Sequence, residues 1–366
     1  MKMKSILTVI LIFSLLFGLS ALFFLREKDD YSPAERRALA KMPILTKNNL
    51  LSGQYAEEWE TFALDQFPMR DSFRTLKALV SFGFFGRKEN NRLFTAKGHL
   101  SKLDDPLRED LILLAKEKLR GLYEANLKDT DCSIYFAVIP DKNFFLAHEV
   151  TLPVPDYEKL ISELNGALSF ARPIPLADTL SLDCFYKTDL HWRNERLLPA
   201  AKRLAEAMVV PLAEDFKEKR VEKPFSGVYV GQSALPFPAE EMLYLTSDAI
   251  ERATVTDYDT GQPRPASVYD EEKADGRDGY DFFLAGATAL ITIENGEALT
   301  EKELVVFRDS FASSLIPLLI PSYRKITLID PRYLEPNLIG RFVSFERQDV
   351  LFLFSSSILA NATVFK

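Results

Sequence analysis

The stretch that decides the fold is ELVVFRDSF, residues 303–311. Residues 303–307 form a nearly continuous apolar run rich in β-formers, which is typical of a strand buried on both faces of a parallel sheet. A helix is expected at 311–320, and a second strand at 325–329, where the sequence reads KITLI. Strand, turn, helix and strand in this order make a βαβ unit of an open parallel sheet.

Further strands and helices flank this unit on both sides. The run SIYFAVI at 133–139 predicts another buried strand, and residues 349–354 predict the last one. Apolar residues at helical spacing predict helices at 107–123, 156–168 and 194–208. The chain is therefore predicted to have an α/β fold, and ligands of such sheets bind at the carboxyl ends of the strands.

The composition is that of an ordinary globular protein. The chain has 366 residues, of which 47% are hydrophobic and 27% charged, and its formal net charge is -8. An acidic chain without a basic stripe argues against nucleic acid as a partner. Two cysteines, Cys132 and Cys184, are too few for a disulfide scaffold, but a single bridge between them stays open.

The N-terminus predicts a membrane anchor over residues 1–25. Lys2 and Lys4 precede an uncharged run at 6–25 that is long enough to span a bilayer. Basic residues before the run place the N-terminus in the cytoplasm and the body outside, as a single-pass protein of the cell membrane. The alternative is a cleaved signal peptide with its cleavage site at Gly18-Leu19-Ser20. The body is exported in both cases.

Three regions are expected along the chain. After the anchor, residues 26–95 are predicted to form a linker and a helical arm, with helices at 55–64 and 73–85 separated by Pro68. Residues 96–366 are predicted to form the main domain. Within it, residues 211–282 are polar and rich in turn residues, and we expect this insertion to form loops over a site.

Ser310 lies where the predicted strand at 303–307 turns into a helix. This position exposes its hydroxyl at the carboxyl edge of the sheet, beside the N–H groups of the helix N-terminus, which suit an oxyanion. The alternative interpretation is that Asp309 or Ser310 is an ordinary helix N-cap.

The second candidate is the sequence YKTDLHW at 186–192. In an extended segment Asp189 and His191 point to the same side, so the carboxylate can hold one imidazole nitrogen and leave the other as a base. A structural hydrogen bond is one alternative and a metal pair another. No cluster of further ligands at metal-binding spacing accompanies the pair, so neither a metal nor a cofactor is predicted.

These motifs resemble the DHHW protein family. YKTDLHW is similar to the family signature, with Leu190 in place of its first His, and RDSFA at 308–312 looks like the C-terminal half. Matching segments follow in order: ERRAL at 35–39, DQFPMR at 65–70, IPDKN at 139–143 and DPRY at 330–333. The family is related to the alginate O-acetyltransferases of the AlgX/AlgJ type. The resemblance implies an SGNH-hydrolase-like (flavodoxin-like) parallel sheet with helices on both faces. It also implies Asp189 as the orienting residue, His191 as the base and Ser310 as the nucleophile.

The chain departs from the family at FLAGA, residues 283–287, where a Gly-Gly-Asn is common. Ala287 cannot replace an Asn as an oxyanion donor. The oxyanion is then expected to rest on backbone N–H groups at 310–312, including Phe311, and on Gly227 or Gly286. Trp192, with Tyr229 and Tyr244, is a candidate for stacking on a sugar, although a core position beneath His191 is the alternative.

The resemblance implies an extracytoplasmic O-acetyltransferase acting on a secreted or cell-surface polysaccharide. Leu190 should face away from the site and have little consequence. A membrane-bound O-acyltransferase would relay the acetyl group across the membrane. Two alternatives remain: an acetyl esterase using the same residues, and a non-catalytic carbohydrate-binding or assembly protein, which the alanines beside Gly286 favour.

Overall fold

In the computed structural model, which describes residues 2–146 and 155–366, the chain forms two compact units. Unit 1 comprises Met1–Asn91 with Val230–Pro236, and unit 2 comprises Arg92–Tyr229 with Phe237–Lys366. A short piece of the polar insertion therefore belongs to the N-terminal unit, because residues 230–236 pack with the arm.

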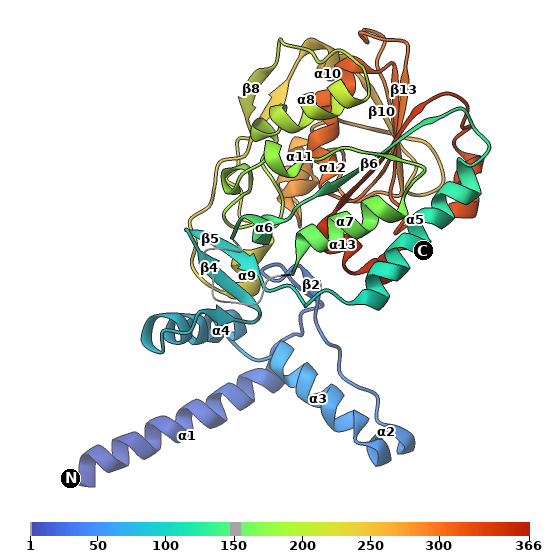
Figure 1. The fold of residues 1–366 in the computed structure, drawn as a ribbon. Coiled ribbons are helices and arrows are strands. Elements are labelled where there is room, and N and C mark those ends of the chain that lie inside the picture. The colour runs from blue at the N-terminus through green and yellow to red at the C-terminus, as the bar shows by residue number, and fades with distance from the viewer. Residues whose placement is uncertain (1, 147–154) are drawn as a thin grey trace. The chain divides into compact units, whose positions relative to one another are not determined.

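Unit 1 begins with the apolar helix α1, drawn in blue in Figure 1. The helix is long and apolar enough to cross a membrane. Its end packs on the helical arm, because the Phe23 ring lies 5.8 Å from the Phe62 ring, edge to face. The two predicted arm helices are confirmed, and the break at Pro68 falls between them. The elements of unit 1 are α1 (Lys2–Leu25), β1 (Tyr31–Ser32), β2 (Arg37–Ala38), α2 (Lys47–Ser52), α3 (Gln54–Asp65), α4 (Arg70–Leu79), the π-helix η1 (Val80–Phe84) and β3 (Glu89–Asn90).

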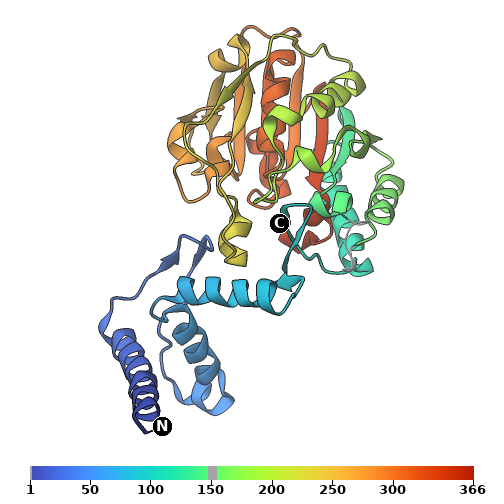
Figure 2. The same ribbon diagram turned by 90° about the vertical axis from the view of Figure 1, so that its left-hand side faces the viewer.

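The centre of unit 2 is an eight-stranded sheet with the order β11-β10-β12-β14-β13-β15-β6-β7. The strands lie side by side in Figure 2. All pairs from β14 to β7 are parallel, and β12, β10 and β11 continue the sheet antiparallel. The predicted α/β fold is confirmed. The strands are β6 (Ser133–Ile139), β7 (Arg172–Pro173), β10 (Thr254–Asp257), β11 (Arg264–Ala266), β12 (Leu290–Glu294), β13 (Glu303–Arg308), β14 (Lys325–Ile329) and β15 (Asp349–Ser355).

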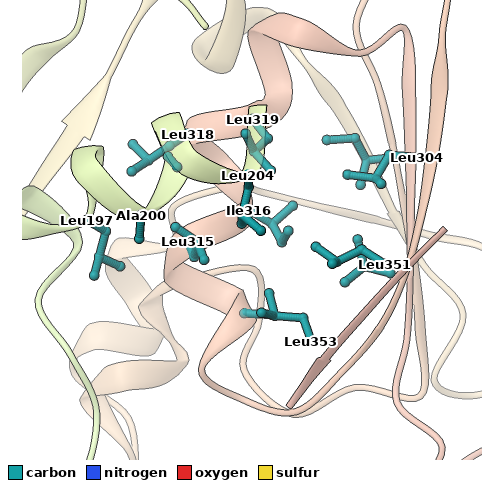
Figure 3. Packing of buried hydrophobic residues seen from close by; sticks show 14 of the residues in the cluster. Leu197, Ala200, Leu204, Leu304, Leu315, Ile316, Leu318, Leu319, Leu351 and Leu353 are labelled. Atoms are coloured by element: carbon teal, nitrogen blue, oxygen red, sulfur yellow. The ribbon is translucent and has the colours of Figure 1, made fainter. Parts of the chain in front are cut away.

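The apolar runs of β13 and β15 bury side chains on both faces of the sheet, because successive residues point to opposite sides. Leu304 and Val306 pack in one hydrophobic cluster with α8 (Leu198–Ala207) and α12 (Ala312–Leu315). Figure 3 shows Leu204, Leu315 and their neighbours meeting the strand residues in this cluster. Val305 and Phe307 pack on the other face with α5 (Glu109–Asn126) and α7 (Tyr157–Ala167).

Two sequence predictions are wrong in this unit. The helix expected at 311–320 ends after one turn of α12 and continues as the 3-10 helix η6 (Ile316–Ser322). Pro317 explains the change, because it has no N–H to continue the α-helical ladder. The insertion at 211–282, expected to form loops, also holds the antiparallel pair β8 (Lys217–Arg220) and β9 (Leu243–Thr246) and the strands β10 and β11. These strands are short and partly exposed, so they leave no continuous apolar run.

The remaining elements of unit 2 are short. The strands among them are β4 (Leu93–Ala96), β5 (His99–Lys102), β8 (Lys217–Arg220) and β9 (Leu243–Thr246). The α-helices are α6 (Lys142–Leu146), α9 (Val228–Ser233), which runs on into unit 1, α10 (Asp248–Arg252), α11 (Glu271–Ala274) and α13 (Ser356–Leu359). The 3-10 helices are η2 (Ala177–Thr179), η3 (Leu182–Cys184), η4 (Asn194–Arg196), η5 (Gly279–Phe282), η7 (Pro336–Arg341) and η8 (Ala362–Val364).

Candidate active site

The structure brings Asp189, His191 and Ser310 together, although 119 residues separate the last two along the chain. The Ser310 hydroxyl donates to His191 Nε2 at 2.8 Å. His191 Nδ1 in turn donates to Asp189 Oδ1 at 2.7 Å. A carboxylate only accepts hydrogen bonds, so this contact fixes the proton on Nδ1 and leaves Nε2 as the acceptor. The three groups form one hydrogen-bonded chain that ends at a serine hydroxyl.

Ser310 owes its position to the end of β13. Asp309, the residue before it, is buried, and its carboxylate accepts from the N–H groups of Phe311 at 3.0 Å and Ser355 at 2.7 Å. The helix α12 (Ala312–Leu315) has its N-cap at Phe311, without a side-chain cap, so neither Asp309 nor Ser310 is the ordinary N-cap considered from sequence. The first contact instead closes the turn before the helix, and the second ties that turn to the end of the neighbouring strand β15. Asp309 thus holds the turn while the Ser310 hydroxyl is left to face His191.

Asp189 and His191 lie in a loop rather than in the extended segment assumed from sequence. The loop is closed where Phe185 pairs with Trp192, and Tyr186 donates its N–H to the carbonyl of His191. Asp189 Oδ1 accepts both the ring Nδ1–H and the backbone N–H of His191, the latter at 3.0 Å. A local turn therefore achieves the same-side placement that strand alternation predicted.

The environment of Asp189 keeps its carboxyl ionised. Burial alone would raise the pKa, but the hydrogen bond with His191 and the electrostatic attraction between the carboxylate and that ring outweigh it. The N–H of Val228 also donates to Asp189 Oδ2 at 2.8 Å. Together these contacts hold the pKa of Asp189 well below its ordinary value. The carboxylate is therefore available at neutral pH to orient the imidazole.

Aromatic rings fix the plane of the imidazole. The Tyr280 ring stacks on His191 with a centroid distance of 3.9 Å and an interplanar angle of 7°. Phe311 packs at 4.9 Å in a tilted arrangement. The Tyr280 hydroxyl is anchored in turn by Ser314 at 2.6 Å. Tyr280 was missed from sequence, because it lies in the polar insertion and nothing local distinguishes it from other loop aromatics.

Two charged residues that support the loop were also missed. Lys142 is buried, and its ammonium donates to the carbonyl oxygens of Leu100 at 2.8 Å and of Asp189 at 2.5 Å. Burial lowers its pKa to about 7. The Glu240 carboxylate accepts from the backbone N–H groups of Lys187 and Thr188, both at 2.8 Å. These contacts hold the loop from two sides, and both arise from distant parts of the sequence.

The four residues expected to bind an oxyanion or substrate already have partners. The N–H groups of Phe311, Gly227 and Gly286 donate to Asp309, Thr188 and the carbonyl of Phe283. Trp192 has no exposed surface, and its indole N–H donates to the Phe311 carbonyl at 2.9 Å. Their roles stay predictions, and each would require a change of partner. The N–H of Ser310 has no acceptor within residues 2–146 and 155–366.

The segment with the alanines forms a strained turn. Leu284, Ala285 and Gly286 all have positive φ values, of 47°, 59° and 76°. The carbonyl of Gly286 accepts from the buried Arg308 at 3.0 Å. A Cβ on Gly286 would lie 1.9 Å from an Asp281 carboxylate oxygen, and the left-handed φ of 76° also favours glycine. The turn is thereby tied to the residue that ends β13, two positions before Ser310.

The other residues noted from sequence are accounted for. Leu190 packs against the hydrophobic core, as expected for a residue facing away from the site. Cys132 and Cys184 are both free thiols, so the possible bridge between them is absent. In the described part of the chain, no three His, Cys, Asp or Glu side chains are grouped so as to hold a metal ion.

Comparison with solved structures supports the predicted fold. No protein-family model and no curated protein matches the chain. A DHHW family protein from Eubacterium siraeum is 20% identical, with a TM-score of 0.58 over 75% of this chain and 93% of that one. Bacillus cereus PatB1 is 18% identical, with a TM-score of 0.59 over 75% of this chain and 99% of that one. PatB1 has also been solved with a sulfonyl adduct.

At these identities the likeness concerns the fold. The resemblance to the DHHW family that the motifs indicated is confirmed at that level. The O-acetyltransferase domain of Pseudomonas putida AlgJ also matches, at 15% identity over 69% of this chain and 84% of that one. Its TM-score of 0.41 is too low to support an argument about this chain.

Proposed function

We propose that this chain is an extracytoplasmic, serine-dependent O-acetyltransferase that acts on a polysaccharide. The observation that carries the proposal is the chain of hydrogen bonds from Asp189 through His191 to Ser310, at 2.7 and 2.8 Å. A serine paired with an oriented neutral imidazole is the arrangement that acyl transfer needs. The acetyl group and the sugar acceptor come from the resemblance to the alginate O-acetyltransferases, and they are part of the proposal.

In the first step the Ser310 oxygen would attack the carbonyl carbon of the acetyl donor, while its proton passes to His191 Nε2. The bond between that carbon and the leaving oxygen then breaks, and the imidazolium returns its proton to the leaving group. Asp189 stabilises the imidazolium, because its low pKa keeps it anionic throughout. The product of this step is an acetyl ester on Ser310.

In the second step a sugar hydroxyl would attack the acetyl-serine carbonyl as His191 removes its proton. Collapse of the tetrahedral intermediate breaks the bond to Ser310, and the serine oxygen takes the proton back. The sugar leaves acetylated and the enzyme is regenerated. The oxyanion formed in each step needs hydrogen-bond donors, and the N–H of Ser310 is the candidate whose donor is not already used.

The proposed location follows from α1, which is long and apolar enough to span a membrane. With Lys2 and Lys4 on the cytoplasmic side, the site would lie outside the cell. Acetyl groups made in the cytoplasm must then cross the membrane, so a membrane-bound O-acyltransferase is the proposed donor. The helix serves as an anchor in this proposal rather than as a cleaved signal.

A non-catalytic carbohydrate-binding role is the second candidate. It is favoured by the engaged N–H groups of Phe311, Gly227 and Gly286, which leave few donors for an oxyanion. An acetyl esterase would use the same three residues with water as the acceptor, and no contact in the site distinguishes it from a transferase.

The test is covalent labelling followed by acetyl transfer. The full-length protein is treated with an aromatic sulfonyl fluoride, a reagent suggested by the sulfonyl adduct of PatB1, and the modified residue is located by mass spectrometry. Labelling at Ser310 is expected in the wild type and in the control Ser357→Ala, but not in Ser310→Ala. Transfer of acetyl from a chromogenic acetate to an oligosaccharide then separates a transferase from an esterase. Absence of both labelling and acetate release would leave the binding role as the better account.

A further inference from the structure

Unit 1 carries a stripe of exposed apolar side chains along α4 and η1. The stripe consists of Met69, Phe73, Leu76, Val80 and Phe84, whose exposed fractions run from 39% for Val80 to 81% for Phe84. Phe73, Leu76, Val80 and Phe84 are three, four and four residues apart, which places them on one face of α4 and its continuation η1, and Met69 directly precedes α4. This α4 stripe is therefore a single apolar surface rather than a set of scattered side chains.

The opposite face of the same helix is already packed. Ala78 is fully buried and Ser81 nearly so. Arg74, on the same side, donates to the carbonyl oxygens of Gly231 at 2.9 Å and Gln232 at 3.1 Å, both within unit 1. The inward face of the helix therefore packs against other residues of unit 1, and the α4 stripe lies on a different face.

An ion-pair corner ties the start of α4 to the segment that follows α1. Arg70 and Arg74 both contact the Glu35 carboxylate, the latter at 3.1 Å. Asp65, at the end of α3, is paired with Arg37 at 2.6 Å and lies close to Arg70. Gln66 is bonded in both directions to the backbone of Asp29, four residues beyond the last residue of α1. The start of α4 is therefore held close to the segment that follows the apolar helix.

We propose that the α4 stripe lies in the lipid–water interface of the membrane that α1 enters. Continuity with α1 is the first reason, because the corner fixes α4 beside the point where the chain would leave the bilayer. Charge is the second, since Lys77 flanks the stripe and Arg87 and Lys88 follow the exposed Phe84 and Phe85. Aromatic and aliphatic residues bordered by basic side chains suit an interfacial helix on an anionic lipid surface. The inference rests on the anchor and not on the chemistry of Ser310.

The test places spin labels on the full-length protein in nanodiscs that contain anionic lipid and one protein copy each. Labels are attached at Leu76→Cys, on the stripe, at Asp71→Cys, on another face of α4, and at Phe13→Cys within α1. Cys132→Ser removes the partly exposed native thiol, and the buried Cys184 is retained. Oxygen accumulates in lipid and nickel chelates stay in water, so the ratio of the two accessibilities reports depth.

The label at Leu76 should show an oxygen-to-nickel accessibility ratio several-fold higher than the label at Asp71, and the Phe13 label should give the highest ratio. Phe84→Cys repeats the measurement at a second stripe position should the Leu76 variant misfold. Ratios at Leu76 and Phe84 as low as at Asp71, with Phe13 deep in lipid, overturn the proposal. A water-like ratio at Phe13 overturns it as well, because the anchor on which it rests is then absent. Protection from both reagents at the stripe, with dipolar broadening when discs hold two copies, shows a protein partner and also overturns it.

Discussion

In unit 2 the side chains of Val306 and Phe307 have no exposed surface, whereas in unit 1 Ile44 and Phe84 each keep 81% of theirs. Unit 2 buries its apolar runs on both faces of one sheet and supports its candidate site with hydrogen bonds from at least three other segments. Unit 1 pairs its charges around Glu35 and Asp65 but leaves much apolar surface uncovered. Unit 2 therefore buries its apolar residues within itself, while unit 1 leaves apolar side chains exposed, as the proposed membrane contact would require.

The largest expected effect concerns the candidate active site of unit 2. Ser310→Ala removes the nucleophile and His191→Ala removes the base, and each should lower kcat for release of acetate from a chromogenic acetate by about 10^4-fold or more. The double variant should lose little more, because the two residues act as one unit. Asp189→Ala should lose less, since it orients and stabilises the imidazole.

Circular dichroism of each variant provides the control for folding. A double variant whose loss equals the product of the two single losses would contradict the view that Ser310 and His191 share one hydrogen-bonded mechanism.

Removing a buried ring from unit 2 should lower the free energy of unfolding by several kcal/mol more than removing an exposed ring from unit 1. Phe307→Ala in the middle of the sheet should lower the free energy of unfolding by about 3–5 kcal/mol, because it leaves a cavity between β13 and its neighbours. The matched change Phe84→Ala in the arm should alter it by less than about 0.5 kcal/mol in detergent, since the ring is 81% exposed. Urea denaturation followed by fluorescence measures the free energy of unfolding of both variants. Equal losses would contradict the difference in packing between the two units.

The sequence predicted the parts that depend on local pattern. The apolar runs at 133–139 and 303–307 identified β6 and β13, because short runs rich in β-formers are typical of strands buried on both faces. The Asp189–His191 pair was found because histidine is rare in this chain and the spacing of two is distinctive. Pro317 also indicates that the helix after Ser310 ends early, whereas the apolar spacing of residues 311–320 favours the longer helix that was predicted.

The parts that were missed depend on contacts between distant segments. Tyr280, Lys142 and Glu240 reach the site from three separate places in the chain, and none carries a periodic or compositional signal. The last two strands at one end of the sheet, β10 and β11, span four and three residues in a turn-rich region. Tertiary contacts likewise decide which backbone N–H groups near Ser310 already have an acceptor. The oxyanion donors could therefore not be chosen from sequence.

A half-buried acid in unit 2, Asp141, should make stability depend on pH. The Tyr157 hydroxyl lies 2.6 Å from an Asp104 oxygen and 3.0 Å from an Asp141 oxygen, so one phenol proton is shared between two carboxyl groups. Burial, with the charge of Asp104, raises the pKa of Asp141 to about 7. A pKa above the unfolded value means that the folded state binds the proton more tightly, so this stability is complete below about pH 4 and is lost as the pH rises through 7.

We expect the free energy of unfolding of the wild type to include a fall of up to about 4 kcal/mol between pH 4 and 7 from this group. Asp141→Asn should flatten that part of the curve, because the amide carries no titrating proton. Urea unfolding at half-unit pH steps makes the measurement, with Asp110→Asn, an exposed carboxyl in the same unit, as the matched control. A wild-type curve that rises through this window and is unchanged in Asp141→Asn would contradict the assignment.

The smallest expected effect concerns Lys142, a buried residue of unit 2 that contacts the loop carrying Asp189 and His191. Its ammonium donates to the carbonyl of Asp189 at 2.5 Å, and its ring neighbour is Tyr229 at 5.4 Å. Lys142→Met keeps the length of the side chain but removes this charge-assisted hydrogen bond, so the loop that carries Asp189 and His191 is less firmly placed. A loss of about 10- to 100-fold in kcat/KM is expected, which corresponds to the 1.5–3 kcal/mol typical of such bonds. Lys187→Met, an exposed lysine in the same loop, should leave kcat/KM unchanged. Equal losses in the two variants, or an unchanged kcat/KM in Lys142→Met, would show that Lys142 does not position the loop.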